Sequence, residues 1–419
     1  MATIAIIAAL DTKGEEARLV RDLIAARGHR PLVVDTGVMG EPRFAPDIPA
    51  EEVARAGGTT LAALRARADR GEAITAMAAG AAALARRLHQ EGRLDGIIGL
   101  GGSAGTAVGS AAMRALPVGV PKLLVSTVAA GNVAPYIGTR DLTLMYSVVD
   151  VAGINRLSRA VLANAAGMIG GAVEAAAQRA TQMATPASEG ERPLLAASMF
   201  GNTTRLVDAA RAIFEQRGYE VLVFHATGTG GRTMEDLIRD GFIAGSYDVT
   251  TTEWADELCG GVFTAGPTRL EAAGERGIPQ VIAPGCLDMV NFGPQETVPA
   301  RYRDDPARKF YLWNPQVTLM RTTPAENAQL GKIIAEKANA ARGPVQLFLP
   351  LRGLSLLDSV TEQGPQPFWW PEADRALFEA IKQHVRPDIP VHELDCNIND
   401  PQFAQATAGA LLAMLGGRQ

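Results

Sequence analysis

Short apolar runs alternate along the chain with segments whose apolar residues recur at helical spacing. Residues 3–10 form an apolar run, and residues 15–27 follow with leucine, valine and isoleucine three and four positions apart. Alternation of this kind is typical of βαβ units and therefore of a parallel sheet. Further buried strands are predicted at residues 31–34, 96–100 and 122–126, and again at residues 345–350.

The opening pattern occurs twice. Residues 4–37 align without a gap with residues 194–227, so that Gly28 falls on Gly218. Four matches in the same order indicate an internal duplication. The sequence thus predicts an α/β protein of two tandem Rossmann-like three-layer domains with parallel sheets, residues 1–185 and 186–419. The three shorter matches join residues 94–106 to 259–268, 119–127 to 277–285, and 142–147 to 317–322.

Composition narrows the classes of protein. The 419 residues suffice for two hydrophobic cores, and the net charge of −5 without a basic block argues against nucleic-acid binding. The three cysteines, Cys259, Cys286 and Cys396, form no metal-binding pair and suit a reducing compartment, so we expect a cytoplasmic protein. The apolar start runs directly into charged residues and is expected to be a strand rather than a signal peptide. No membrane span is expected.

Polar residues follow the predicted strands of the first half, at the edge where parallel α/β sheets bind ligands. Asp11, Thr12 and Lys13 come after the first strand, and a lysine beside a helix N-terminus suits a phosphate. Helix capping by Asp11 or Thr12 is the alternative. Asp35 and Thr36 end the second strand, where an acid commonly meets a ribose.

A glycine-rich segment, GGSAGT, follows the third strand. Glycines let the backbone approach an oxyanion and hydroxyls add donors, but such turns also serve to pack a helix against a strand. Small polar residues after the fourth strand either bind a ribose or base edge or form a turn. The predicted nucleotide contacts are Gly101, Gly102, Ser103, Gly105 and Thr106, followed by Ser126, Thr127, Gly131 and Asn132.

The remaining candidates are a metal site and a catalytic pair. Asp141 and Asp150 flank the next strand and could assist Mg²⁺, although Asp150 equally suits a helix cap. In the second half, His225 precedes a loop with three glycines and is the candidate general acid or base, with a structural role as the alternative. Arg352 either clamps an anion or makes a surface ion pair.

Six motifs occur in order: ALDTKGEE, GLGGSAGT, STVAAGNVAPYIG, DLTLMYSVVDVAGINRLSR, SMFGNTTR and FHATGTGGRTME. Together they resemble the ATP-binding amino-terminal region of the tomato mosaic virus resistance protein family and its free-standing bacterial relatives, over nearly the whole chain. The resemblance implies two Rossmann-like domains, ATP bound with Mg²⁺, and a homodimer. It also implies a separate TIM-barrel protein as a partner, because bacterial relatives often accompany one.

These observations predict an ATP-binding protein, with the nucleotide in the first domain, that acts as a regulatory or assembly module. The alternative is an ATP-dependent enzyme that phosphorylates or activates a small polar metabolite held in an inter-domain cleft. No hydrolase elbow or zinc-protease motif is present, so the sequence names no reaction. A dinucleotide oxidoreductase is disfavoured because the first strand–helix turn, DTKGEE, lacks the required glycines.

Overall fold

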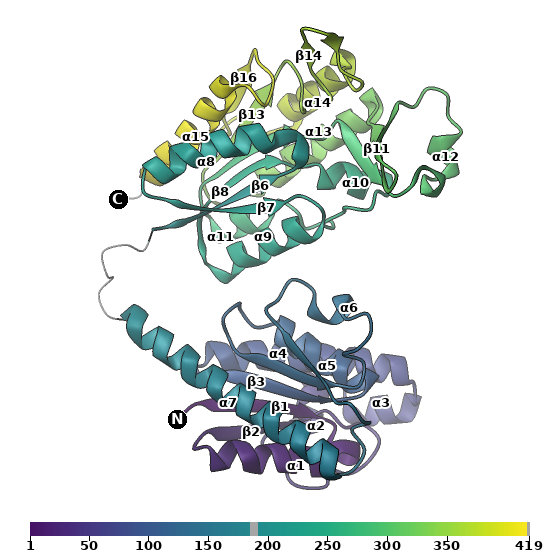
Figure 1. Ribbon diagram of the computed structural model, residues 1–419, viewed down its shortest axis with the longest axis vertical. Coiled ribbons are helices and arrows are strands. Elements are labelled where there is room, and N and C mark those ends of the chain that lie inside the picture. Colours follow the sequence, from purple (N-terminus) through teal and green to yellow (C-terminus); the bar gives the residue numbers. More distant parts are fainter. Residues whose placement is uncertain (185–191, 417–419) are drawn as a thin grey trace. The chain divides into compact units, whose positions relative to one another are not determined.

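The computed structural model describes residues 1–184 and 192–416, which belong to two compact units, Met1–Glu189 and Gly190–Gln419 (Figure 1). The boundary predicted between residues 185 and 186 lies outside the described residues. Each unit is an α/β domain with its own parallel sheet, as the alternation of apolar runs and helical patterns predicts.

The first unit contains a five-stranded sheet in the order β2-β1-β3-β4-β5, with every neighbouring pair parallel. This order reverses direction between β1 and β3, which is where ligands bind in doubly wound sheets. The strands are β1 (Thr3–Ala8), β2 (Arg30–Asp35), β3 (Gly96–Gly101), β4 (Lys122–Ser126) and β5 (Thr143–Tyr146). The helices are α1 (Leu10–Ala26), α2 (Ala50–Ala56), α3 (Leu61–Arg67), α4 (Arg70–Gln90), α5 (Ser103–Arg114), α6 (Ala134–Ile137) and α7 (Arg156–Ala184).

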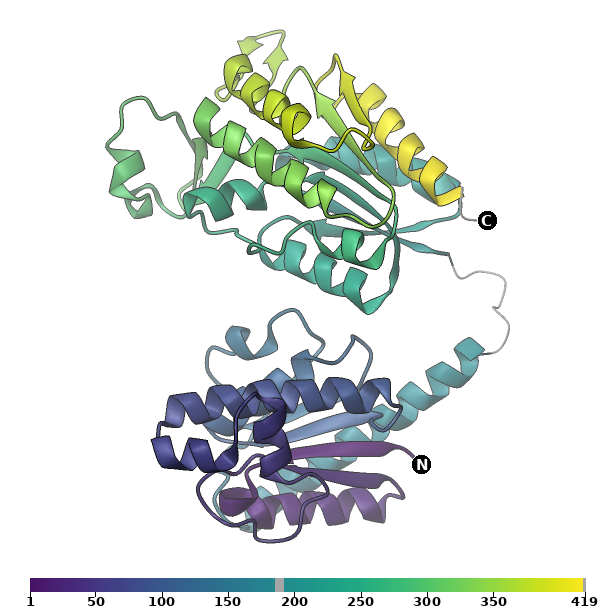
Figure 2. The ribbon, with the colours of Figure 1, turned by 180° about the vertical axis from the view of Figure 1, so that it is seen from behind.

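Helices cover both faces of this sheet. On one face, Val53 of α2, Leu84 of α4 and Val108 of α5 belong to the core that contains Ile97 of β3. On the other face, α1 and α7 bury their apolar stripes against the opposite side chains of the same strands. Figure 2, which shows the ribbon of Figure 1 from behind, has α4 in front of this sheet. Because both faces of the sheet are packed against helices, only the ends of its strands are left to contact a ligand.

Helix α7 is long and apolar enough to satisfy a length-and-hydropathy criterion for a membrane span over Arg156–Ala180. In this fold it is part of the globular core, because Leu162, Ala166, Ile169 and Val173 are buried against the sheet. A core helix meets the same criterion. The expectation that no membrane is involved stays a prediction.

The second unit contains a six-stranded parallel sheet in the order β7-β6-β8-β9-β13-β16. Its strands are β6 (Leu194–Met199), β7 (Glu220–His225), β8 (Ile243–Thr250), β9 (Gln280–Gly285), β13 (Val345–Pro350) and β16 (Val391–Leu394). Its helices are η1 (Gly201–Thr203), α8 (Thr204–Gln216), α9 (Thr229–Asp240), α10 (Glu253–Cys259), α11 (Ala272–Arg276), η2 (Gln295–Thr297), α12 (Ala300–Arg303), α13 (Pro324–Asn339), α14 (Pro371–His384) and α15 (Pro401–Gly416). Helix α15 covers its own sheet together with α8.

An antiparallel sheet, β10-β12-β11, is added to this unit. It stands beyond the edge at which the parallel strands end (Figure 1). The alternation of helices and strands did not predict it. Its strands are β10 (Met289–Phe292), β11 (Phe310–Asn314) and β12 (Val317–Arg321), and a separate two-stranded ribbon joins β14 (Val360–Thr361) to β15 (Gly364–Pro365).

Both parallel sheets place their first five strands in the order 2-1-3-4-5, as a duplication requires. Two of the four sequence matches are nevertheless wrong. The strand of the second unit that corresponds to β3 is β8. Residues 259–268 instead begin at the last residue of α10 and continue into the loop after it, where Gly260 adopts a left-handed conformation with φ 78°. The partner of β5 is β13, because residues 317–321 form β12 of the antiparallel sheet. Glycine after an apolar run also ends helices, which explains the first error.

Candidate functional site

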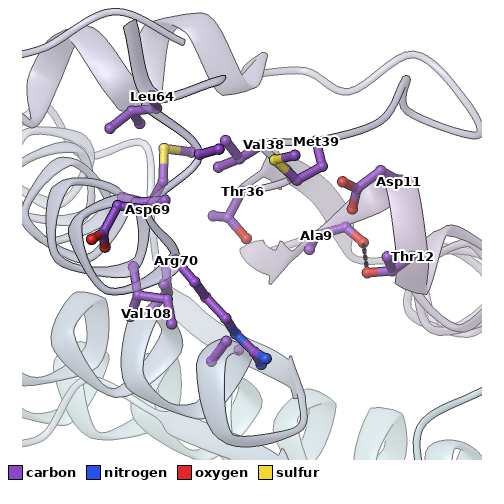
Figure 3. A pocket seen from close by; sticks show the side chains of 17 residues that line it. Ala9, Asp11, Thr12, Thr36, Val38, Met39, Leu64, Asp69, Arg70 and Val108 are labelled. Atoms are coloured by element: carbon purple, nitrogen blue, oxygen red, sulfur yellow. Dashed lines mark hydrogen bonds between the residues drawn. The ribbon is translucent and has the colours of Figure 1, made fainter. Parts of the chain in front are cut away.

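A cavity of about 440 Å³ lies at the carboxyl ends of β1, β2 and β3. We call it the first-unit cavity. The chain after β1 contributes Ala9, Asp11 and Thr12, and α5 contributes Ala104 and Gly105 (Figure 3). The cavity therefore lies at the point where the strand order reverses. Its apolar lining comes from Val38, Met39, Leu64, Ile74, Met77 and Val108.

Two carboxylates lie beside Gly37 at this strand edge. Oδ1 of Asp35 accepts hydrogen bonds from the amides of Leu10 (2.9 Å) and Gly37 (2.8 Å), so this side chain holds the start of α1. Burial raises the pKa of Asp35, against those amide bonds, and nearby Asp11 raises it further. Oδ2 of Asp11 accepts from the Gly40 amide at 3.1 Å, while its buried Oδ1 has no hydrogen-bond partner. Asp11 is the carboxylate with an unused acceptor.

The segment predicted to be a loop before the first helix is its first turn. Helix α1 begins at Leu10, and the amide of Lys13 donates to the carbonyl of Ala9 at 2.7 Å. Lys13 then breaks the helical geometry with φ −120° and ψ 20°. Full burial of Leu10 explains the early start, because its side chain belongs in the core below. Lys13 does not line the first-unit cavity.

The glycines after β3 divide into two kinds. A Cβ on Gly101 would lie 2.9 Å from the Cα of Gly105, and a Cβ on Gly105 would lie 2.9 Å from the carbonyl oxygen of Leu100. Both positions are glycine because α5 packs tightly on β3. A Cβ on Gly102 would meet only Oγ1 of Thr127, at an ordinary 3.7 Å. Packing therefore does not explain Gly102, which precedes α5 at an N-terminus that no described side chain caps.

The predicted hydroxyl contacts are largely engaged inside the protein. Thr106 and Ser126 are fully buried and share a hydrogen bond of 2.6 Å between their hydroxyl oxygens. Oδ1 of Asn132 accepts from the amide of Ala134 and so holds the short helix α6. Among the other predicted contacts, Ser103, Thr127 and Gly131 lie in exposed or partly exposed positions near the ends of β3 and β4, and Thr36 is a buried lining residue of the cavity.

The two predicted metal ligands lie apart from one another. Asp141 precedes β5 and bonds Nζ of Lys122 at 2.7 Å and the amide of Gly119 at 2.8 Å. Lys122 begins β4, so this carboxylate lies at the amino edge, roughly 16 Å of strand away from the cavity at about 3.3 Å per residue. Asp150 is exposed after β5. Asp141 was predicted to be a magnesium ligand, but in the structure it is the ion-pair partner of Lys122, away from the cavity.

Sequence reasoning missed Arg70, the first residue of α4. Its side chain lines the first-unit cavity, and no described residue forms an ion pair with it (Figure 3). Asp69 beside it caps α4 by accepting from the amide of Glu72 at 2.8 Å. An unpaired guanidinium and an uncapped helix N-terminus at one cavity can together bind an anion. An arginine that opens a helix carries no sequence signal for this role.

In the second unit, the loop after His225 is closed by an internal carboxylate. Oε1 of Glu253 accepts from the amides of Gly228 (2.7 Å) and Gly231 (3.1 Å), which are the groups that a phosphate would use. A Cβ on Gly230 would lie 1.9 Å from the carbonyl oxygen of His225. These glycines are explained by packing around Glu253 rather than by a ligand.

His225 and Arg352 have different surroundings. The imidazole of His225 is exposed and stacks on the ring of Phe200, with centroids 5.3 Å apart. Arg352 forms a two-pronged ion pair with Asp395 at 2.7 and 2.8 Å on the surface. This pair holds the pKa of Asp395 below its ordinary value. The surface ion pair was the alternative prediction for Arg352.

Comparison with known proteins assigns the chain. The N-terminal domain of "Uncharacterised protein family (UPF0261)" matches residues 2–178, and the C-terminal domain of the same family matches residues 192–415. The chain belongs to the UPF0261 family. A UPF0261 protein of Clostridium tetani is 50% identical over 98% of both chains. The "ToMV resistance protein Tm-1(GCR237)" of Solanum lycopersicum is 42% identical over 82% of this chain and 44% of its own length.

These relatives confirm the resemblance drawn from the six motifs. A solved UDP-N-acetylglucosamine 2-epimerase from Rickettsia bellii is 11% identical, covering 67% of this chain and 78% of that chain with a TM-score of 0.23, which supports no argument about the site. Two of the motifs that mark the UPF0261 chain, ALDTKGEE and GLGGSAGT, contribute Asp11, Thr12, Ala104 and Gly105 to the first-unit cavity.

Proposed function

We propose that the first unit binds a nucleotide, ATP with Mg²⁺, in the first-unit cavity, and acts as a binding module. The observation that carries this proposal is one cavity with an apolar lining and an anion-binding end. The base would pack among Val38, Leu64 and Met77, and the phosphates would meet the N-terminus of α5 and the guanidinium of Arg70.

The metal would be held mainly by the nucleotide. Among the described residues, no group of three or more histidine, cysteine or acidic side chains could hold a metal ion. Mg²⁺ in nucleotide sites commonly uses one or two carboxylates, phosphate oxygens and water. Asp11, with its unpartnered Oδ1, supplies such a carboxylate. Asp35 would act indirectly by holding the start of α1.

The first test is Gly102→Val, measured by calorimetric titration with ATP and Mg²⁺. The new side chain has room in the fold but would cover the N-terminus of α5, so we expect ATP binding to weaken at least tenfold. Gly171→Val is the matched control, since a Cβ at Gly171 of α7 meets nothing within 4 Å. Unchanged ATP affinity in Gly102→Val, with the thermal midpoint intact, would remove the proposed site.

The second test separates phosphate from base. Charge-assisted hydrogen bonds contribute about 1.5–3 kcal/mol, so Arg70→Ala should weaken ATP binding about tenfold or more and adenosine binding much less. Arg86→Ala is the control, because Arg86 is exposed on the same helix outside the cavity. Equal losses for ATP and adenosine would contradict a phosphate contact. An ATP-dependent reaction, dimerisation, a TIM-barrel partner and a cytoplasmic location stay predictions.

A further inference from the structure

The second unit has a cavity of its own, of about 190 Å³, which we call the second-unit cavity. It lies where the chain leaves β6 and β7 and meets the β11–β12 hairpin of the antiparallel sheet. Whole ligand sites usually measure about 300–1,000 Å³. A volume of this size therefore suits one ring system rather than a whole nucleotide.

Aromatic side chains form much of its wall. Phe200 and His225 stack with their ring centroids 5.3 Å apart and their planes at 21°, and Phe263 meets Phe200 edge-on at 6.3 Å. Trp313 of β11 also lines the cavity and remains 49% exposed. Rings that are already held in place and partly open to solvent form a stacking surface for a planar ligand.

One polar group in this lining lacks a partner. Asn202 is only 2% exposed, yet its Oδ1 has no hydrogen bond. The rest of the residue is fixed, because its carbonyl oxygen accepts from Nδ2 of Asn399 at 3.0 Å and its Nδ2 contacts Sδ of Met289 at 3.5 Å. A buried acceptor without a donor is costly, so a ligand that supplies an N–H would gain the missing bond.

The lining of this cavity lacks the lysine and arginine side chains that favour a phosphate. None of its lining residues is an aspartate, glutamate, lysine or arginine. The nearby amides of Gly228 and Gly231 are taken by Glu253. We propose that the second-unit cavity binds an uncharged planar heteroaromatic ring that carries an amino or N–H donor, the chemistry of an amino-bearing nucleobase. This proposal does not depend on nucleotide binding in the first unit.

Tryptophan fluorescence tests the proposal directly. All four tryptophans, at positions 254, 313, 369 and 370, belong to the second unit, so a change on ligand addition reports that unit. We expect adenosine to change the fluorescence of the full chain and Trp313→Phe to lose most of this change while still binding adenosine by calorimetry. Purine riboside, which lacks the amino group, should bind at least tenfold more weakly. Equal affinity for the two nucleosides would overturn the role of Asn202.

Side-chain variants locate the site. Trp313→Ala should lose one adenosine site per chain in equilibrium dialysis, whereas Leu312→Ala, whose residue is 57% exposed on the same hairpin and outside the cavity, should keep it. The same number of adenosine sites per chain as in the parent, in both Trp313→Ala and Asn202→Leu with an unchanged thermal midpoint, would overturn the proposal, whereas adenosine left in the first-unit cavity would not. Gly102→Val reports on the first-unit cavity with ATP, so failure of either proposal is read separately.

Discussion

The buried side chain of Arg269 offers the sharpest stability test. Its guanidinium is 1% exposed and binds three carboxylates: Asp248 through both Nη atoms at 2.5 and 2.6 Å, Glu253 through Nε at 2.6 Å, and Glu235 at 3.2 Å. These carboxylates are themselves 0–6% exposed. Arg269→Met fills much of the same space but leaves Asp248 and Glu253 without a cation and Glu235 with only Arg239, at 3.5 Å.

Removing one partner from a buried ion pair costs about 3–5 kcal/mol. The three contacts of Arg269 share one cation, so their losses do not add, and we expect about 4 kcal/mol for Arg269→Met. This is a large part of the ~5–15 kcal/mol that stabilises a typical domain. With a urea slope of about 3 kcal/mol per molar, the unfolding midpoint of the second unit should fall by roughly 1 M.

The assay is urea unfolding of the full chain followed by tryptophan fluorescence, which reports the second unit. Arg352→Met is the matched control, since it removes an exposed ion pair and should leave the midpoint unchanged. The stability deficit of Arg269→Met should shrink at pH 5, because burial already raises the pKa of Glu235 and this carboxyl can then take up a proton. Equal midpoints for the two variants at pH 7.5 would refute this reasoning.

Two further predictions concern the second unit. Gly230→Ala should prevent folding of this unit, because the Cβ would lie 1.9 Å from the carbonyl oxygen of His225. Gly201→Ala is the control and should unfold at the parent's temperature, because a Cβ there meets nothing within 4 Å. Equal thermal midpoints for the two variants would contradict this packing argument. Burial raises the pKa of Asp288 to about 7, so the stability it contributes is present below about pH 4 and is lost as the pH rises through about 7. Asp288→Asn, which keeps an acceptor for Ser355, should therefore be more stable than the parent at pH 8 but not at pH 4, as urea titrations at both values would show.

The sequence predicts those strands whose burial is carried by apolar residues. β4 and β13 were predicted to the residue, because most of their side chains are apolar and turn residues bound them. β8 was missed because its buried face includes Asp248. From the local sequence an aspartate is expected to be exposed. Asp248 can be buried only because Arg269, 21 residues later, pairs with it. A buried ion pair joins residues that are distant in sequence, so the local pattern of apolar and polar residues cannot predict it.

The same reasoning applies to the site. Polar residues after β1 and β3 could be assigned to the ligand edge from strand order alone, and Asp11 and Gly105 do line the first-unit cavity. The hydroxyls of Thr106 and Ser126 were equally plausible contacts in the sequence, but they bond each other. Arg70 and all of the apolar wall except Val108 come from the segment between β2 and β3. The position of this segment over the strand ends depends on how α3 and α4 pack.

The two units differ at the N-terminus of the helix that follows their third strand. The N-cap and first residue of the helix after the third strand are Gly102-Ser103 in the first unit and Thr252-Glu253 in the second. Glycine and serine leave the N-terminus of α5 open to an external anion. Glu253 instead supplies an internal anion to the amides of the neighbouring glycine loop and is neutralised by Arg269. The two proposals follow from this difference: the open N-terminus of α5 would accept a phosphate, whereas the second-unit cavity, lined by aromatic and uncharged polar residues, would accept an uncharged ring.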